Sequence, residues 1–268
     1  MPEPEPVADP ADPRLADYVE LTDAAARRHR ERDELFVAEG VTAIERLLGS
    51  GHHIRSVVVT PTALARLAGR LDSVDAPVYL VSKAVLAAAV GFNLHRGAIA
   101  AADRRPLPSV ADAVQGARRI AVLEGLNDPE NLGAIARSAR ALGVDALVLD
   151  PTCIDPYYRR TVRVSMGEVL YLPVARAASW PGDLDVLAAA GVETWALTPD
   201  PSAEPIWALD VPPRVALMLG AEGPGLSAAA LARADRRVRI PIAAAVDSLN
   251  VGHAAAVAFA ALSRFRAE

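Results

Sequence analysis

The sequence predicts an α/β protein whose C-terminal part contains a mainly parallel sheet covered by helices on both faces. Two observations carry this prediction. From residue 118 onward, short apolar runs alternate with glycine-containing turns and helical patterns, which is the order that a parallel sheet with crossover helices requires. Before that point, residues 103–108 (DRRPLP) combine charges with two prolines, and this composition is typical of an exposed connection between domains.

The first domain is expected over residues 14–105 and is the smaller of the two. Residues 1–13 precede it, and because proline alternates there with acidic residues, we expect a flexible tail. A helical pattern covers residues 41–48, and apolar or β-branched runs predict strands at 55–59, 78–81 and 97–101. Residues 106–117 are expected to link this domain to the second one, which covers residues 118–268.

The second domain has six predicted strands, with helices between most of them. The strands are expected at residues 119–123, 146–149, 172–175, 193–197, 215–219 and 238–240. In such a sheet a ligand binds at the carboxyl ends of the strands, so polar residues that follow strands are the candidates for a functional site.

The composition limits the classes of function. The chain has 268 residues, a formal net charge of −5 and one cysteine, Cys153. A single cysteine excludes an intrachain disulfide and a cysteine-clustered zinc site, and we expect no bound metal. The acidic balance argues against a surface that coats nucleic acid throughout. A local cluster of Arg27, Arg28, Arg30 and Arg32 fits either a phosphate-binding patch or a charged helix face.

No segment of the sequence predicts a membrane anchor. The apolar runs stop well short of the roughly 18 residues that a spanning helix needs. The N-terminus lacks the basic start and apolar core of a signal peptide. We therefore expect a soluble, cytoplasmic protein.

A first polar segment, residues 127–137 (NDPENLGAIAR), follows the strand predicted at 119–123. Apolar residues recur at helical spacing from about Asn131, and Arg137 falls outside their stripe at about 100° per residue. Arg137 is therefore expected to point away from the core. In a second interpretation, Asn127, Asp128 and Asn131 are simply candidates for the cap of this helix.

A second segment, residues 219–225 (LGAEGPG), follows the strand predicted at 215–219. Glycines allow a backbone to approach a ligand closely, and Glu222 supplies a carboxylate that accepts hydrogen bonds from hydroxyl, amine or guanidinium groups. The same residues fit a tight turn with a solvated glutamate.

A third segment, residues 239–251, leads from the last predicted strand through Ser248 and Asn250 into an alanine-rich helix. A polar helix start directly after a strand is where an α/β protein places a ligand. Alternatively, Asp247 or Ser248 caps the helix and Asn250 lies in its first turn. No chemistry is assigned to His253.

One further cluster combines aromatic and basic side chains: Tyr157, Tyr158, Arg159, Arg160 and Arg163. Such side chains bind RNA bases and phosphates. An amphipathic helix has the same composition, so both interpretations stay open.

Taken together, the three polar segments resemble the signature motifs of the SpoU/TrmH family of S-adenosylmethionine-dependent RNA ribose 2′-O-methyltransferases, which belong to the SPOUT class. The resemblance covers residues 118–266 and rests on NLG at 131–133 with Arg137, LGAEG at 219–223, and Ile240-Pro241 with SLNV at 248–251. Residues 36–40 (FVAEG) and 95–99 (HRGAI) resemble, more loosely, the family's N-terminal substrate-binding domain.

The resemblance implies a trefoil knot at the C-terminus, S-adenosylmethionine as cofactor, and a homodimer in which an arginine of one subunit completes the site of the other. It implies that Gly220, Ile240 and Leu249 hold the cofactor, largely through backbone groups, with Thr198 as a further contributor. The sequence departs from many relatives at residues 252–253 (GH), where a serine and a small aliphatic residue are common. This departure puts the local packing of the last helix in question.

The resemblance also implies the reaction, methyl transfer to a ribose 2′-hydroxyl. Ribosomal RNA is expected ahead of transfer RNA, and a catalytically silent RNA-binding or ribosome-assembly factor is the alternative. By resemblance, Arg137 is nearest the reacting hydroxyl. Because a guanidinium keeps its proton in proteins, we expect Arg137 to orient the ribose and stabilise the developing alkoxide rather than act as a base. Asn131, Glu222, Ser248 and Asn250 complete the expected catalytic set as a polar shell.

Overall fold

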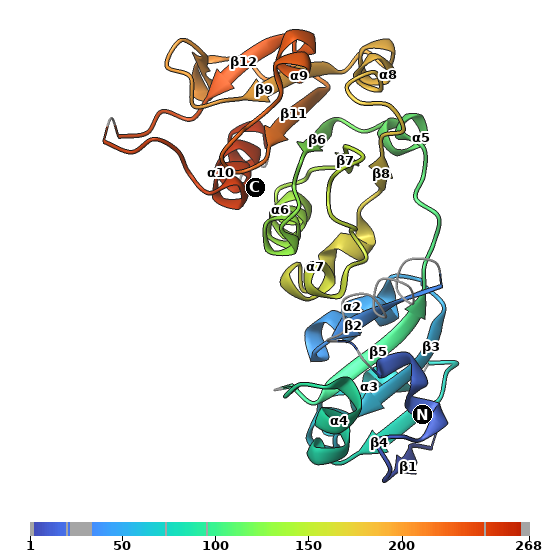
Figure 1. Ribbon diagram of the computed structural model, residues 1–268. Helices are drawn as coiled ribbons and strands as arrows, with labels where there is room; N and C mark the ends of the chain where they lie inside the picture. Colours follow the sequence, from blue (N-terminus) through green and yellow to red (C-terminus); the bar gives the residue numbers. More distant parts are fainter. Residues whose placement is uncertain are drawn as a thin grey trace. The chain divides into compact units, whose positions relative to one another are not determined.

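The computed structural model describes residues 3–19, 21, 34–72, 74–94, 96–243 and 245–263. The chain forms two compact α/β units, whose elements are labelled in Figure 1. The first unit contains Met1–Arg105 and Tyr157–Leu170, and the second contains Pro106–Pro156 and Tyr171–Glu268.

The first unit is built on a five-stranded sheet. Its strands are β1 (Glu5–Val7), β2 (Leu35–Glu39), β3 (Ile54–Val59), β4 (Val78–Val81) and β5 (Ala98–Asp103), and its helices include η1 (Pro13–Tyr18), α2 (Val41–Gly49), α3 (Pro61–Leu71) and α4 (Lys83–Val90). The strand order is β1-β4-β3-β5-β2, with β5 antiparallel to both of its neighbours. Apolar residues of η1 and α4 pack together with alternate strand residues on one face. Because successive strand residues face opposite sides, the buried residues of α2 and α3, which contact the same strands, cover the other face.

The expectation of a flexible tail over residues 1–13 is wrong for the described part of that segment. Residues 5–7 form β1, which pairs in parallel with β4, and Val7 is buried. Pro6 is compatible with this position because an edge strand needs hydrogen bonds on one side only. The proline-rich composition gave no sign that Val7 is buried or that this segment pairs with the edge of the sheet.

The second unit contains a seven-stranded sheet in the order β10-β12-β9-β11-β6-β7-β8. Its strands are β6 (Arg119–Glu124), β7 (Ala146–Leu149), β8 (Val174–Arg176), β9 (Glu193–Leu197), β10 (Glu204–Pro205), β11 (Val215–Gly220) and β12 (Arg236–Arg239). Every neighbouring pair is parallel. The predicted parallel sheet is thus confirmed.

Helices cover both faces of this sheet. They are α5 (Val110–Val114), α6 (Pro129–Ala141), α8 (Leu184–Ala189), α9 (Ala228–Arg233) and α10 (Val251–Leu262), with the short η3 (Ile206–Ala208). Apolar residues of α5, α8 and α9 share one core cluster with alternate residues of the strands. Helices α6 and α10 pack against each other (Figure 1) and bury their apolar residues outside that cluster, so they cover the opposite face. No helix in the described ranges is both long and apolar enough to cross a lipid bilayer.

Two domain boundaries differ from the expectation. The proposed linker over residues 106–117 contains α5, whose Val110, Ala113 and Val114 belong to the core of the second unit. The segment Tyr157–Leu170, expected in the second domain, belongs to the first unit. It contains α7 (Arg159–Val164), which contacts β2. A domain built from separate stretches of chain cannot be recognised from local composition.

Candidate active site

The parallel sheet of the second unit has a point where two neighbouring strands lead to opposite faces. Strand β6 continues into α6 on one face, and its neighbour β11 continues through a glycine-rich turn into α9 on the other. Open α/β sheets bind ligands at the carboxyl ends of two strands whose following segments diverge in this way. The first two polar segments of the sequence lie at this edge.

Helix α6 begins two residues before the position predicted from the sequence. Asp128 is its N-cap and accepts a hydrogen bond from the Glu130 backbone N–H at 2.8 Å, and Pro129 occupies the first helical position. The capping interpretation of Asn131 is therefore wrong. Asn131 lies in the first turn, half-buried, and its amide is available for a contact outside the helix.

The turn after β11 requires glycine at position 220. A Cβ added to Gly220 would lie 2.0 Å from the carbonyl carbon of Gly225 and 2.2 Å from the Leu226 nitrogen. The turn folds back on the end of its own strand, where the Gly225 N–H donates to the Ala221 carbonyl at 2.9 Å. Glu222 lies exposed at the tip of this turn.

The cap of α10 is Asn250, and neither Asp247 nor Ser248 takes this role. The Asn250 Oδ1 accepts from the backbone N–H groups of Gly252 at 3.0 Å and His253 at 3.2 Å. Its backbone is not helical, and the helix begins at Val251, two or three residues later than a cap at Ser248 or Asp247 would require.

The same Asn250 amide joins the three polar segments. Its Nδ2 donates to Asn131 Oδ1 at 3.0 Å and to Glu222 Oε1. Glu222 Oε1 also accepts from the Val251 backbone N–H at 3.4 Å. We call Asn131, Glu222 and Asn250 the amide–carboxylate cluster. Its members are 28 to 119 residues apart in the sequence.

The departure from the family at residues 252–253 is accommodated in the helix packing. Gly252 is buried, and a Cβ at this position would lie 3.3 Å from the Ala134 Cβ and 3.2 Å from Asn250 Oδ1. The absence of a side chain lets the start of α10 approach α6 closely. Helix α10 continues without interruption to Leu262.

The other predicted site residues lie outside the hydrogen bonds of this cluster. Arg137 on α6 and Ser248 before α10 are both exposed. Thr198 follows β9, where its N–H donates to the Val238 carbonyl at 2.9 Å and its hydroxyl accepts from the Asp200 N–H at 3.2 Å. Ile240 directly follows β12 and is half-buried, whereas Leu249 exposes 39% of its surface. Three of the residues expected to bind the cofactor thus lie at the carboxyl ends of neighbouring strands: Thr198 after β9, Gly220 at the end of β11 and Ile240 after β12.

The aromatic and basic cluster at residues 157–163 packs within the first unit in large part. Arg159 forms an ion pair with Glu39 and lies over the Phe92 ring, and Tyr157 stacks on Phe36 with ring centroids 5.0 Å apart. Arg160 is exposed. The four arginines between residues 27 and 32 and the histidine at position 95 lie outside the described residues.

Three supporting residues were not recognised from the sequence. Arg119 is buried and donates to the Leu262 carbonyl at 3.0 Å, which anchors the last turn of α10. Asp150, directly after β7, accepts from the Gly125 N–H at 3.2 Å and so holds the turn that precedes α6. Glu124, the last residue of β6, accepts from Trp180 and from the Ser227 backbone. In each case the available signal in the sequence was a charged residue at, or next to, one end of an apolar strand.

The charge of Asp150 is stabilised by its surroundings. Burial by itself would raise the pKa of this carboxyl group. Hydrogen bonds from Thr152, Cys153 and the Gly125 backbone outweigh that effect and lower the pKa of Asp150 below its ordinary value. Among the described residues, no group of three or more histidine, cysteine, aspartate or glutamate side chains is arranged to hold a metal ion.

Comparison with known proteins assigns the chain to a family. Residues 118–260 match the SpoU rRNA Methylase family, and residues 20–91 match the MRM3-like substrate binding domain. The chain is 49% identical over 258 residues to an uncharacterized tRNA/rRNA methyltransferase of Mycobacterium tuberculosis, covering 94% of this chain and 89% of the relative. It is 29% identical over 231 residues to the 23S rRNA (guanosine(2553)-2′-O)-methyltransferase RlmP of Bacillus subtilis, covering 86% and 89%.

A solved structure agrees over nearly the whole chain. The AdoMet-bound rRNA methyltransferase from Sinorhizobium meliloti superimposes with a TM-score of 0.81 at 26% identity, covering 96% of this chain and 97% of that one. These matches confirm the resemblance drawn from the three polar segments and the order of the two domains. The chain belongs to the SpoU rRNA methylase family.

Proposed function

We propose that this protein transfers a methyl group from S-adenosylmethionine to a ribose 2′-hydroxyl of RNA, and that its substrate is ribosomal RNA. The observation that carries the proposal is the Asn250 amide, which holds Asn131 and Glu222 together at the carboxyl edge of β6 and β11. Membership of the SpoU family supports the reaction class. The name of the Bacillus subtilis relative supports ribosomal RNA as the substrate.

The residues at this edge fit the proposed cofactor. The segment between β12 and α10 carries three partly exposed apolar side chains, Ile242, Val246 and Leu249, which expose 36%, 50% and 39% of their surface. Apolar side chains next to a few directed polar groups are typical of cofactor sites. We propose that Gly220, Ile240 and Leu249 hold the cofactor together with Thr198. S-Adenosylmethionine, when bound, supplies a methyl group that its sulfonium makes electrophilic.

The side chains of the site then have distinct tasks. Arg137 orients the ribose and the adjacent phosphate through its forked donors and stabilises the alkoxide as the hydroxyl loses its proton to phosphate or water. The amide–carboxylate cluster, with Ser248, positions the target nucleotide. Alignment of the attacking oxygen can contribute up to about 7–11 kcal/mol to catalysis.

The proposal extends to assembly and location. A homodimer is supported by α10, which is apolar except for His253 and exposes Val257 at its surface. In this dimer an arginine of one subunit completes the site of the other, and the C-terminal segment forms a trefoil knot. The protein acts in the cytoplasm, where ribosomal RNA is available. Sedimentation equilibrium checks the dimer: a monomer at micromolar concentration contradicts it.

The reaction is tested with purified protein, methyl-labelled S-adenosylmethionine and total RNA from cells that lack the protein. We expect label in ribosomal RNA and none with Asn250→Ala. The matched control is Ser263→Ala, since Ser263 follows the far end of α10 and its hydroxyl donates to the Ala260 carbonyl of the same helix. Label confined to transfer RNA would move the substrate to that class. RNA binding without label in any RNA would support a silent assembly factor.

A further inference from the structure

We propose that Glu124 is a positioning residue for the glycine-rich turn between β11 and α9, and that it acts through this turn on Glu222 and on the cofactor. This inference rests on the proposed function. Glu124 is the last residue of β6 and pairs in register with Gly220, the last residue of β11. It therefore lies at the base of the turn, at the carboxyl ends of β6 and β11, without belonging to the amide–carboxylate cluster.

The two carboxylate oxygens of Glu124 bind two different segments. Oε2 accepts from the Ser227 backbone N–H at 2.9 Å, and Oε1 accepts from the Trp180 indole N–H at 2.6 Å. Ser227 is the N-cap of α9, and its hydroxyl accepts from the Ala230 N–H at 3.2 Å. A carboxylate at the start of a helix is favourably placed for both hydrogen bonding and charge.

Glu124 thereby fixes both ends of the turn. Its strand pairs with Gly220 at the beginning, and its side chain holds Ser227 at the end. Between these points the Gly225 N–H donates to the Ala221 carbonyl and closes the turn whose tip carries Glu222. Because Glu222 Oε1 accepts from Asn250, a displaced turn would separate Glu222 from the cluster. It would also shift Gly220, one of the residues proposed to hold the cofactor.

The test compares Glu124→Gln with the same carboxylate-to-amide change at the amino ends of the strands. Glutamine keeps the size of the side chain but can accept at one atom only, so one of the two bonds is lost. The control is Asp235→Asn. Asp235 lies just before β12 and accepts from the Thr194 N–H at 2.7 Å and hydroxyl at 2.8 Å, at the amino ends of the strands.

For Glu124→Gln we expect the Kd for S-adenosylmethionine, measured by calorimetry, to rise about ten-fold, since a hydrogen bond to a charged acceptor is lost. We expect kcat to fall as well, with the KM for RNA within about two-fold of wild type. Asp235→Asn removes a carboxylate charge away from the turn but keeps one oxygen that can accept both Thr194 bonds, and it should leave the cofactor Kd and kcat unchanged. A Glu124→Gln protein that loses thermal stability but keeps both constants would overturn the proposal.

A second variant decides the matter if Glu124→Gln does not fold. Trp180→Phe removes the indole donor, together with part of the ring volume, and keeps an aromatic ring in place. A two-fold or greater rise in the cofactor Kd supports the proposal, and an unchanged Kd overturns it. Wild-type protein that binds no S-adenosylmethionine would instead refute the proposed function itself, so the two failures are distinguishable.

Discussion

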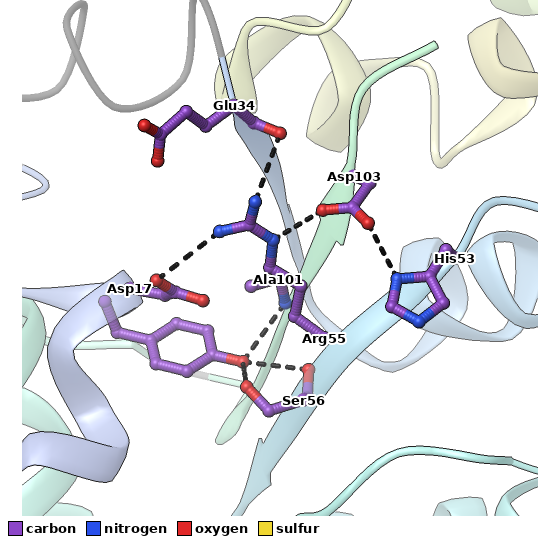
Figure 2. A network of polar contacts seen from close by, with 8 residues as sticks. Asp17, Glu34, His53, Arg55, Ser56, Ala101 and Asp103 are labelled. Carbon is purple, nitrogen blue, oxygen red and sulfur yellow. Dashed lines mark hydrogen bonds and ion pairs between the residues drawn. The ribbon is translucent and has the colours of Figure 1, made fainter.

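Charged side chains have different surroundings in the first unit and in the candidate site of the second unit. In the first unit, the Arg55 guanidinium donates to Asp103 at 2.5 Å, His53 Nδ1 lies 2.7 Å from the other oxygen of Asp103, and Asp17 is 3.9 Å from Arg55 (Figure 2). These groups come from different elements of the unit and neutralise one another. Arg55 holds the pKa of Asp103 below its usual value, although partial burial opposes this shift.

A second, more deeply buried ion pair of the first unit also joins opposite charges from different elements. Glu39 pairs with Arg159, and both side chains are almost completely buried, at 12% and 13% exposure. Arg163 lies 3.6 Å from the second oxygen of Glu39. Buried charges have to be paired because their desolvation is costly.

In the second unit, the candidate site leaves opposite charges unneutralised. Among the described residues, neither Glu222 nor Arg137 has an ion-pair partner, and both side chains are exposed. Exposed charges need no partner to be stable, and they remain available to a ligand. The first unit thus pairs the charges that maintain its fold, whereas Glu222 and Arg137, which we propose to act on the substrate, are exposed.

The largest effect is expected where the site has no room for change. In Gly220→Ala, the new Cβ would meet the Gly225 backbone at 2.0 Å, so the turn must move. We expect the affinity for S-adenosylmethionine to fall at least about 100-fold, equivalent to about 2.8 kcal/mol, in a calorimetric titration. The control is Gly69→Ala on α3, where nothing lies within 4 Å. It should stabilise the protein by about 0.5–1 kcal/mol. Wild-type cofactor binding by Gly220→Ala would contradict the proposed role of the turn.

The next effect concerns the free guanidinium of the site. Arg137→Lys keeps the charge but loses the forked donors, and we expect the single-turnover rate of methyl transfer to fall about 100-fold. The cofactor Kd should stay within two-fold of wild type. Arg140→Lys, on the same helix, should retain nearly full turnover. Near-normal turnover by Arg137→Lys would show that a forked donor is not needed.

Breaking the buried Glu39–Arg159 pair should lower the stability of the protein. Glu39→Ala leaves Arg159 buried without its carboxylate, and we expect the free energy of unfolding to fall by about 3 kcal/mol in urea denaturation followed by fluorescence. Glu5→Ala breaks an exposed pair with Arg14 and should cost less than about 1 kcal/mol. Equal losses in the two variants would contradict the distinction between buried and exposed charges.

The smallest effect is a pH dependence of the first unit. Burial, and secondarily the charge of Arg105, lowers the pKa of His52 to about 4. The unfolded chain, with a pKa of about 6.5, binds the proton more readily than the folded one between these values. The free energy of unfolding should therefore fall, by about 2 kcal/mol, as the pH decreases from about 6.5 to 4. His52→Gln should remove this slope from denaturation curves measured across the range, and a slope that persists in the variant would assign it to another group.

The sequence by itself determined the class of fold and the identity of the polar segments. Strand β7 begins and ends where its apolar run does, because a strand buried on both faces of a parallel sheet has to be continuously apolar. The three segments were recognised from residue type and order. Those signals are local, and each depends only on neighbours along the chain.

Tertiary structure alone decided which residues meet. Val7, in a proline-rich stretch, lies in an edge strand that pairs with β4. Arg159, 120 residues away from Glu39 in the sequence, forms an ion pair with it. Asn250 caps α10 because its Oδ1 accepts from the helix start. Its Nδ2 at the same time donates to Asn131 and Glu222. Such contacts depend on how the strands are ordered in the sheet, and composition and periodicity along a single chain carry no information about that order.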